Sequence, residues 1–179
     1  APIDVFWFRL SKARTPDNQT TGVIKTGRLL ALLDRGDYWQ CAYVIPKGGI
    51  AEVQKKGLPE FPRDIVAINP ALADRVSEIA SWDDVSLLTV RIDRLREWCR
   101  PGLLVVGDAA HAMSPVGGVG INLAIQDAVA TANILAAPLS HGPVPLGILR
   151  KVQERREWPT RMTQSFQILA QDRFVSPAL

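Results

Sequence analysis

The sequence has few of the residues that build covalent or metal-bound frameworks. Its 179 residues include only two cysteines, Cys41 and Cys99, and two histidines. Two cysteines cannot form the disulfide framework of a small secreted domain, so we expect buried, reduced thiols in a cytoplasmic protein. The two histidines lack the spacing of metal ligands, so we expect no metal site.

The chain also lacks the features of membrane and nucleic-acid proteins. No apolar run approaches the roughly 20 residues that span a bilayer, and the first residues do not form a signal peptide. The formal net charge is only +3, and the 21 lysines and arginines are scattered along the chain. We therefore expect neither a nucleic acid nor a membrane as partner. With 47% hydrophobic residues and no repeats, the sequence predicts a packed globular core.

Two glycine-rich phosphate-binding motifs are missing as well. The run Gly118-Val119-Gly120-Ile121-Asn122-Leu123 ends in leucine and begins well after the nearest predicted strand. It is therefore not the dinucleotide-binding turn of a βαβ unit. A Gly-Lys-Ser/Thr sequence, which ends a phosphate-binding loop, does not occur either.

The most informative stretch that is present runs from residue 102 to residue 135. Its first apolar residues, 103–106, predict a short buried parallel strand, and Gly107-Asp108 follow where this strand ends. A loop of small residues comes next, called here the glycine loop (residues 112–120). Apolar residues at helical spacing then predict a helix, with one buried face formed by Ile121, Ala124, Ile125, Ala128, Ala132 and Leu135.

The residue types in this stretch suit an electron-rich ligand. An ionised Asp108 only accepts hydrogen bonds, which fits either a ligand hydroxyl or a helix or loop cap. The first amides of the helix, at Gly120, Ile121 and Asn122, lack intrahelical partners and carry about half a positive charge. The Asn122 side chain fits a second ligand contact or a cap of the helix start.

The same residues resemble a known motif. Gly107-Asp108-Ala109-Ala110-His111, followed by Pro115, Gly117, Gly120, Asn122 and Asp127-Ala128, is similar to the second flavin-binding motif of FAD-dependent aromatic hydroxylases. That family includes the para-hydroxybenzoate and ubiquinone-biosynthesis hydroxylase types.

The resemblance implies a role for several residues. Asp108 would hold the ribityl chain of FAD, and Pro115 would lie near the isoalloxazine ring, unless it only shapes the loop. The amides of Ile121 and Asn122 would face the N1–C2=O edge of the flavin. His111 belongs to the motif and is given no catalytic role.

The resemblance also implies a reaction. The family hydroxylates an aromatic or related ring substrate with NAD(P)H and oxygen, through a flavin hydroperoxide. Two alternatives stay open: a related flavin-dependent reductase or halogenase, and an isolated flavoprotein fragment without catalysis.

The rest of the chain predicts strands and helices around this motif. The predicted strands are 3–10, 28–33, 38–45 and 85–92, and 28–45 forms an antiparallel hairpin after a loop over 11–22. A helix or turn is predicted over 50–56 with Gly57 as cap, and helices over 62–79, interrupted at Pro70, and over 146–174, kinked or split at Pro159. On the last helix, we expect Arg155 and Arg156 to lie on a solvated face.

Together these elements predict an α/β fold with α+β character. Residues 1–100 would form a substrate-binding antiparallel sheet layer with helices. Residues 101–138 would form the last strand-helix unit of an FAD-binding Rossmann-like domain, and 139–179 the C-terminal helices. In the sheet layer, Trp39, Gln40 and Tyr43 are candidates for binding the substrate, although aromatic residues in strands also serve as core.

The family's first βαβ unit, whose glycine-rich turn binds the ADP half of FAD, does not occur in this sequence. The chain therefore resembles the C-terminal portion of a longer enzyme. We expect an N-terminal segment or another chain to complete the FAD site. By itself the chain would not retain FAD, and the glycine loop would be loose.

Overall fold

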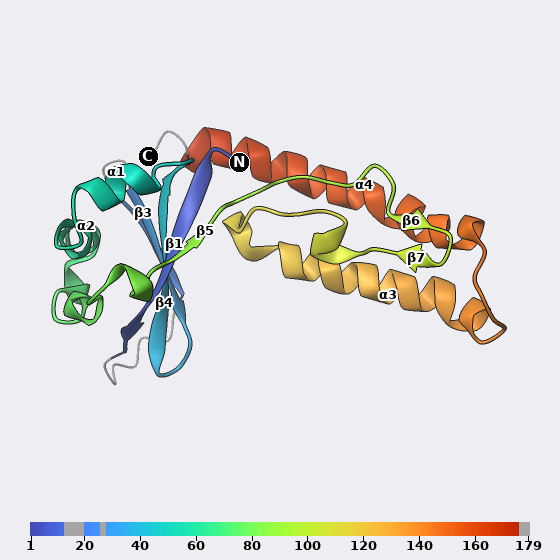
Figure 1. Cartoon of the computed structure of the whole chain (residues 1–179), viewed down its shortest axis with the longest axis horizontal. Coiled ribbons are helices and arrows are strands. Elements are labelled where there is room, and N and C mark those ends of the chain that lie inside the picture. Colours follow the sequence, from blue (N-terminus) through green and yellow to red (C-terminus); the bar gives the residue numbers. More distant parts are fainter. Residues whose placement is uncertain (13–19, 26–27, 176–179) are drawn as a thin grey trace. The chain divides into compact units, whose positions relative to one another are not determined.

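The computed structural model of the chain describes residues 1–12, 20–25 and 28–175. The chain forms two compact units. One contains Ala1–Thr89 with the described residues from Gln171 onward, and the other contains Val90–Ala170. The first is built on an antiparallel sheet and the second on two long helices (Figure 1). The predicted mixed α/β chain with an antiparallel sheet is thus confirmed.

The sheet of the first unit has five strands in the order β2-β3-β4-β1-β5, all antiparallel. Their bounds are β1 Ile3–Ser11, β2 Thr21–Lys25, β3 Arg28–Asp34, β4 Tyr38–Pro46 and β5 Ser86–Leu88. The predicted hairpin over 28–45 is confirmed by the pairing of Leu29 with Val44 and of Asp34 with Trp39.

Two strands differ from the prediction. The first two residues of strand β2, Thr21 and Gly22, fall in the loop predicted over 11–22, of which residues 13–19 lie outside the described chain. Strand β2 is an edge strand with only two β-branched apolar residues, Val23 and Ile24, and its pairing with β3 sets it. Strand β5 is shorter than predicted, because it pairs with β1 only opposite Val5–Trp7.

The core of this unit lies between the sheet and helices α1 (Ile50–Lys55) and α2 (Glu60–Ile68). The ring of Phe61 meets those of Phe6, Phe8 and Tyr43 edge to face, with centroids 5.6, 5.5 and 5.3 Å away. The predicted helix 50–56 is confirmed, and Gly57 follows it at φ +89°, as a C-terminal cap requires.

The predicted helix 62–79 is only partly confirmed. Helix α2 ends at Ile68 because Asn69, which precedes Pro70, takes an extended conformation. Three single 3-10 turns follow at Pro70–Leu72, Val76–Glu78 and Trp82–Asp84.

The second unit begins with a short hairpin rather than the predicted parallel strand. β6 (Cys99–Arg100) pairs antiparallel with β7 (Leu103–Leu104) across Pro101 and Gly102. Proline followed by a glycine with φ +75° favours such a turn. In the described chain the strand predicted over 103–106 is thus limited to Leu103–Leu104 and has no parallel neighbour, and Leu103 is 54% exposed rather than buried.

Helices α3 (Gly120–Leu139) and α4 (Leu146–Ala170) run side by side in this unit (Figure 1). Helix α4 continues through Pro159 without splitting, and a π-helical turn, Gln171–Val175, follows it. The stretch Val116–Leu139 has the length and mean hydropathy, 1.3, that a membrane span needs. By length and composition, the expectation that no apolar run approaches such a span does not hold for the described residues. Core helices of globular proteins meet the same criterion, and this stretch contains the buried Asp127.

The apolar face predicted for α3 is only partly buried, with Leu135 as its buried member. The buried residues of the helix are Leu123, Asp127, Ala130 and Leu135. Ile121 and Ile125, on the predicted face, are 69% and 56% exposed. Apolar residues surround α3, so their spacing alone does not single out the side that packs.

Candidate cofactor site

Asp108 lies at the tip of a tight turn. The 3-10 turn Gly107–Ala109 is closed by the amides of Ala110 and His111, which both donate to the Gly107 carbonyl at 2.9 Å. Asp108 is exposed, and its carboxylate has no hydrogen-bond partner among the described residues. It therefore caps neither a helix nor a loop, and it is available to a ligand.

The glycine loop is shaped by its own glycines and held from α4. Gly117 and Gly118 have φ values of +79° and +61°, which other residues rarely adopt. The buried amide of Gln167 donates to the carbonyls of Ser114 and Val116, at 2.9 and 2.8 Å. These carbonyls flank Pro115, so α4 fixes the part of the loop that carries this proline.

Helix α3 begins without a side-chain cap. Its N-cap residue is Val119, and the amide of Asn122 bonds the Val119 carbonyl at 3.1 Å. Of the three amides predicted to be free, those of Gly120 and Ile121 have no partner among the described residues. The side chains of Ile121 and Asn122 are exposed, and Asn122 makes no side-chain bond within the described chain. The helix start can therefore receive an electron-rich group.

Gly120 serves a packing role at this helix start. Its φ is not positive, so its conformation is open to other residues. A Cβ atom at this position would lie only 3.3 Å from the Met113 Cβ, which is closer than most such contacts. The glycine thus lets the loop lie against the first turn of α3.

A buried polar network connects the Asp108 turn to both helices. Asp127, on α3, is fully buried. Its Oδ2 accepts from the Gly107 amide at 3.0 Å and lies 2.6 Å from the His111 Nε2. Its Oδ1 accepts from the Nε of Arg156, on α4, at 2.7 Å. Since an ionised carboxylate only accepts, the Nε2 of His111 carries the proton.

Comparisons with known proteins identify the family of the chain. The chain matches the FAD binding domain family over residues 10–165. The chain belongs to this family. The match confirms the resemblance on which the flavin motif at 107–128 was predicted.

The chain is similar in sequence to a monooxygenase and to a hydroxylase. Over 169 residues the chain is 35% identical to 6-methylpretetramide 4-monooxygenase of Streptomyces rimosus. This alignment covers 93% of the chain and 40% of that protein. Over 62 residues it is 37% identical to 3-demethoxyubiquinol 3-hydroxylase of Escherichia coli K12, covering 34% of this chain and 16% of the relative. The chain thus spans at most about 40% of the length of these relatives.

Solved structures share the fold. PqsL of Pseudomonas aeruginosa, in complex with 2-aminobenzoylacetate, aligns with a TM-score of 0.74 and 19% identity, over 93% of this chain and 47% of that one. The tetrameric form of 2-methyl-3-hydroxypyridine-5-carboxylic acid oxygenase aligns with a TM-score of 0.77 and 18% identity, over 98% and 48%.

Within this FAD binding domain, the predicted cofactor residues lie on one continuous segment. Asp108, Pro115, Gly117, Gly120, Ile121 and Asn122 all belong to the Asp108 turn, the glycine loop or the first turn of α3. Their contact with FAD stays a prediction.

The predicted substrate residues lie on two faces of the sheet. Trp39 and Tyr43 belong to the core side of β4, and burial raises the pKa of the Tyr43 phenol. Nearby Asp64 raises this pKa further, and Arg28 lowers it. Gln40 lies on the other side, where its Oε1 accepts from the Arg35 Nε at 2.9 Å.

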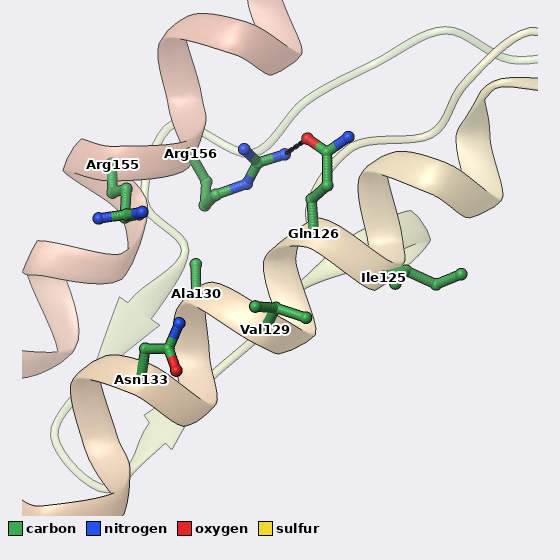
Figure 2. Close-up of a pocket in the computed structure, with 7 residues that line it drawn as sticks. All are labelled: Ile125, Gln126, Val129, Ala130, Asn133, Arg155 and Arg156. Atoms are coloured by element: carbon green, nitrogen blue, oxygen red, sulfur yellow. Dashed lines mark hydrogen bonds between the residues drawn. The ribbon is translucent and has the colours of Figure 1, made fainter.

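The sequence did not single out Asp127 and Arg156 as a pair. Arg156 was expected on a solvated face, but it is 8% exposed and also donates to the Gln126 Oε1 at 2.9 Å (Figure 2). The neighbouring Arg155 is exposed. Both arginines help to line a pocket between α3 and α4, with Ile125, Gln126, Val129, Ala130 and Asn133. Arg156 falls on the same helical face as the apolar Leu149 and Val152, and this position was the sequence signal that could have indicated its burial.

Proposed function

We propose that this chain binds the ribityl and ring part of FAD in a flavin-dependent monooxygenase. One observation carries the proposal: in a member of the FAD binding domain family, Asp108 is exposed and has no hydrogen-bond partner among the described residues, and neither have the first amides of α3. Residues 101–138 would then be the last strand-helix unit of a Rossmann-like FAD domain.

Each element of the site would have a defined task. The Asp108 carboxylate accepts a hydrogen bond from a ribityl hydroxyl. The amides of Gly120 and Ile121, with the positive end of α3, stabilise negative charge at the N1–C2=O edge of the flavin. Pro115 and Gly117 let the ring approach the backbone, and Asn122 adds a side-chain contact. FAD supplies the redox and oxygen chemistry when it is bound.

We further propose that the substrate is an aromatic or related ring, that NAD(P)H is the reductant, and that the product is hydroxylated. The names of the relatives, a monooxygenase and a hydroxylase, support this reaction class. Both cysteines are free and buried, which fits a cytoplasmic enzyme. The glycine turn for the ADP half of FAD is absent from this sequence, so we propose that residues of another segment or chain bind that half.

The first experiment tests the Asp108 contact. Replacing Asp108 by alanine in the protein that carries this chain should weaken FAD binding about 10- to 100-fold, because a charge-assisted hydrogen bond contributes ~1.5–3 kcal/mol. Titration of the cofactor-free protein with FAD measures the effect. Asp93→Ala, which changes another exposed aspartate of the same unit, is the matched control. Equal affinities of the Asp108 variant and the wild type would refute the assignment.

The second experiment tests the reaction class. Consumption of oxygen and NAD(P)H should both depend on an added phenolic ring substrate, and the product should gain one oxygen atom. Reduction of an isoprenoid chain, or halogenation that requires a halide, would instead assign the protein to one of the two related enzyme classes. A protein that binds FAD without turnover of any of these substrates would support the non-catalytic alternative.

A further inference from the structure

The carboxylate of Asp127 holds both ends of the turn that carries Asp108. The Gly107 amide, just before Asp108, donates to Oδ2 at 3.0 Å, and the Nε2 of His111, three residues after Asp108, lies 2.6 Å from the same oxygen. Both contacts are buried, so water does not compete for them. The turn is therefore attached to α3 on both sides of Asp108.

Gly107 packs against the same helix. Its φ is +60°, and a Cβ atom built on it would lie 3.1 Å from the Cβ of Ala124 on α3. This close approach leaves the turn little room to move away from α3. The Asp108 side chain itself makes no hydrogen bond within the described chain, so only its backbone fixes where its carboxylate lies.

The same helix carries the other predicted flavin contact. Asp127 lies about two turns after Gly120, where α3 begins with its free amides. One rigid helix thus connects the start of α3 to the turn that presents Asp108. Arg156 pairs with Asp127 from α4, through a bond of 2.7 Å between its Nε and the Asp127 Oδ1, so the buried carboxylate has a partner of opposite charge.

We propose that Asp127 is a positioning residue for FAD: it fixes Asp108 relative to the start of α3, so that the ribityl chain and the flavin ring are bound together. This inference rests on the proposed function. His111 would act in the same way, as the second attachment of the turn, and not as an acid or base toward the cofactor.

A double-mutant cycle on FAD affinity tests the proposal in the protein that carries this chain. Asp127→Asn keeps the size of the side chain and should weaken FAD binding about tenfold. In the Asp108→Ala background it should cause less than about a twofold further loss, because a displaced Asp108 matters only while its carboxylate is present. Glu154→Gln, which neutralises an exposed carboxylate on α4, is the matched control and should leave the affinity unchanged.

Hydrogen exchange gives a readout that does not need FAD. In the cofactor-free protein the Gly107 amide should be protected, and Asp127→Asn should speed its exchange at least about tenfold. If Asp127→Asn does not fold, the pair Asp127→Asn/Arg156→Gln, which leaves no buried charge unpaired, replaces it in every arm of the experiment.

The outcomes separate the two proposals. Unchanged FAD affinity in Asp108→Ala refutes the Asp108 contact and with it the proposed function of this turn. A loss in Asp108→Ala with a fully additive loss in Asp127→Asn refutes only the positioning role, since the aspartate then affects binding through general stability. Unchanged Gly107 exchange in Asp127→Asn also refutes it.

Discussion

The strongest prediction for stability concerns the ion pair between Asp127 and Arg156. Its Nε–Oδ1 distance of 2.7 Å equals that of the pair between Arg28 and Asp64 on the first unit. The two pairs differ in burial: the side chains of Asp127 and Arg156 are 0% and 10% exposed, and those of Asp64 and Arg28 are 21% and 34% exposed. Burial, and not distance, should therefore decide what each pair contributes.

Asp127→Asn should lower the free energy of unfolding by about 3–5 kcal/mol, because it leaves the Arg156 charge buried without a partner. Asparagine also places an NH₂ group where the carboxylate accepts from three donors, so at least one of them loses its acceptor. Asp64→Asn should lower the free energy of unfolding by only ~0–1 kcal/mol, since water screens that partly exposed pair.

Urea unfolding of the protein that carries this chain measures these values, with Arg156→Gln and the double variant completing the cycle. The double variant should be less destabilised than the sum of the two single variants by at least about 1 kcal/mol, because it leaves no unpaired charge. Additive losses, or an Asp127→Asn loss as small as that of Asp64→Asn, would refute the reasoning.

Three further predictions concern single positions. Gly107→Ala should destabilise the protein more than Gly102→Ala does in urea unfolding: both have positive φ, +60° and +75°, but only at Gly107 would a Cβ meet another atom, at 3.1 Å. Burial, and then the charge of a nearby glutamate, raises the pKa of the Cys41 thiol from 9.0 to about 12, so its protonated form is favoured in the folded state. The free energy of unfolding should therefore fall by up to about 1.4 kcal/mol per pH unit above pH 9, and Cys41→Ala should make this fall smaller. The same fall in the wild type and in Cys41→Ala would contradict this interpretation. Gln167→Leu should speed hydrogen exchange across the glycine loop, whereas Gln153→Leu, elsewhere on α4, should not; equal effects would contradict a specific role of Gln167.

The sequence predicted what depends on apolar alternation and on turn residues. The hairpin over 28–45, the helix ending at Gly57 and the run of flavin-motif residues all follow from local patterns that the fold keeps. The sequence did not predict contacts that depend on a partner far along the chain. Strand β5 is limited to the residues that pair with Val5–Trp7 of β1, and the turn at Gly107 is held by the carboxylate of Asp127.

The burial of several polar residues was also not predicted from the sequence. Gln164 donates to the carbonyls of Asp93 and Ala112, and Gln167 to two carbonyls of the glycine loop. These glutamines and Arg156 lie on the buried side of α4, where hydrophobic periodicity predicts apolar residues. Periodicity cannot find them, because it assigns polar residues to the solvent.

The chemistry of the Asp108 turn explains why this interior is polar. The Gly107 amide is buried against α3, and leaving it without an acceptor would destabilise the fold by about 1–3 kcal/mol, so the helix must supply an acceptor at that position. An apolar residue at position 127 would fill the space but leave this amide unpaired, and a carboxylate brings a charge that in turn requires Arg156. Three donors around one carboxylate also fix the direction of the turn, which dispersion contacts between apolar groups would not do. The geometry around Asp108 thus depends on a polar contact chain that runs from the turn through α3 to α4.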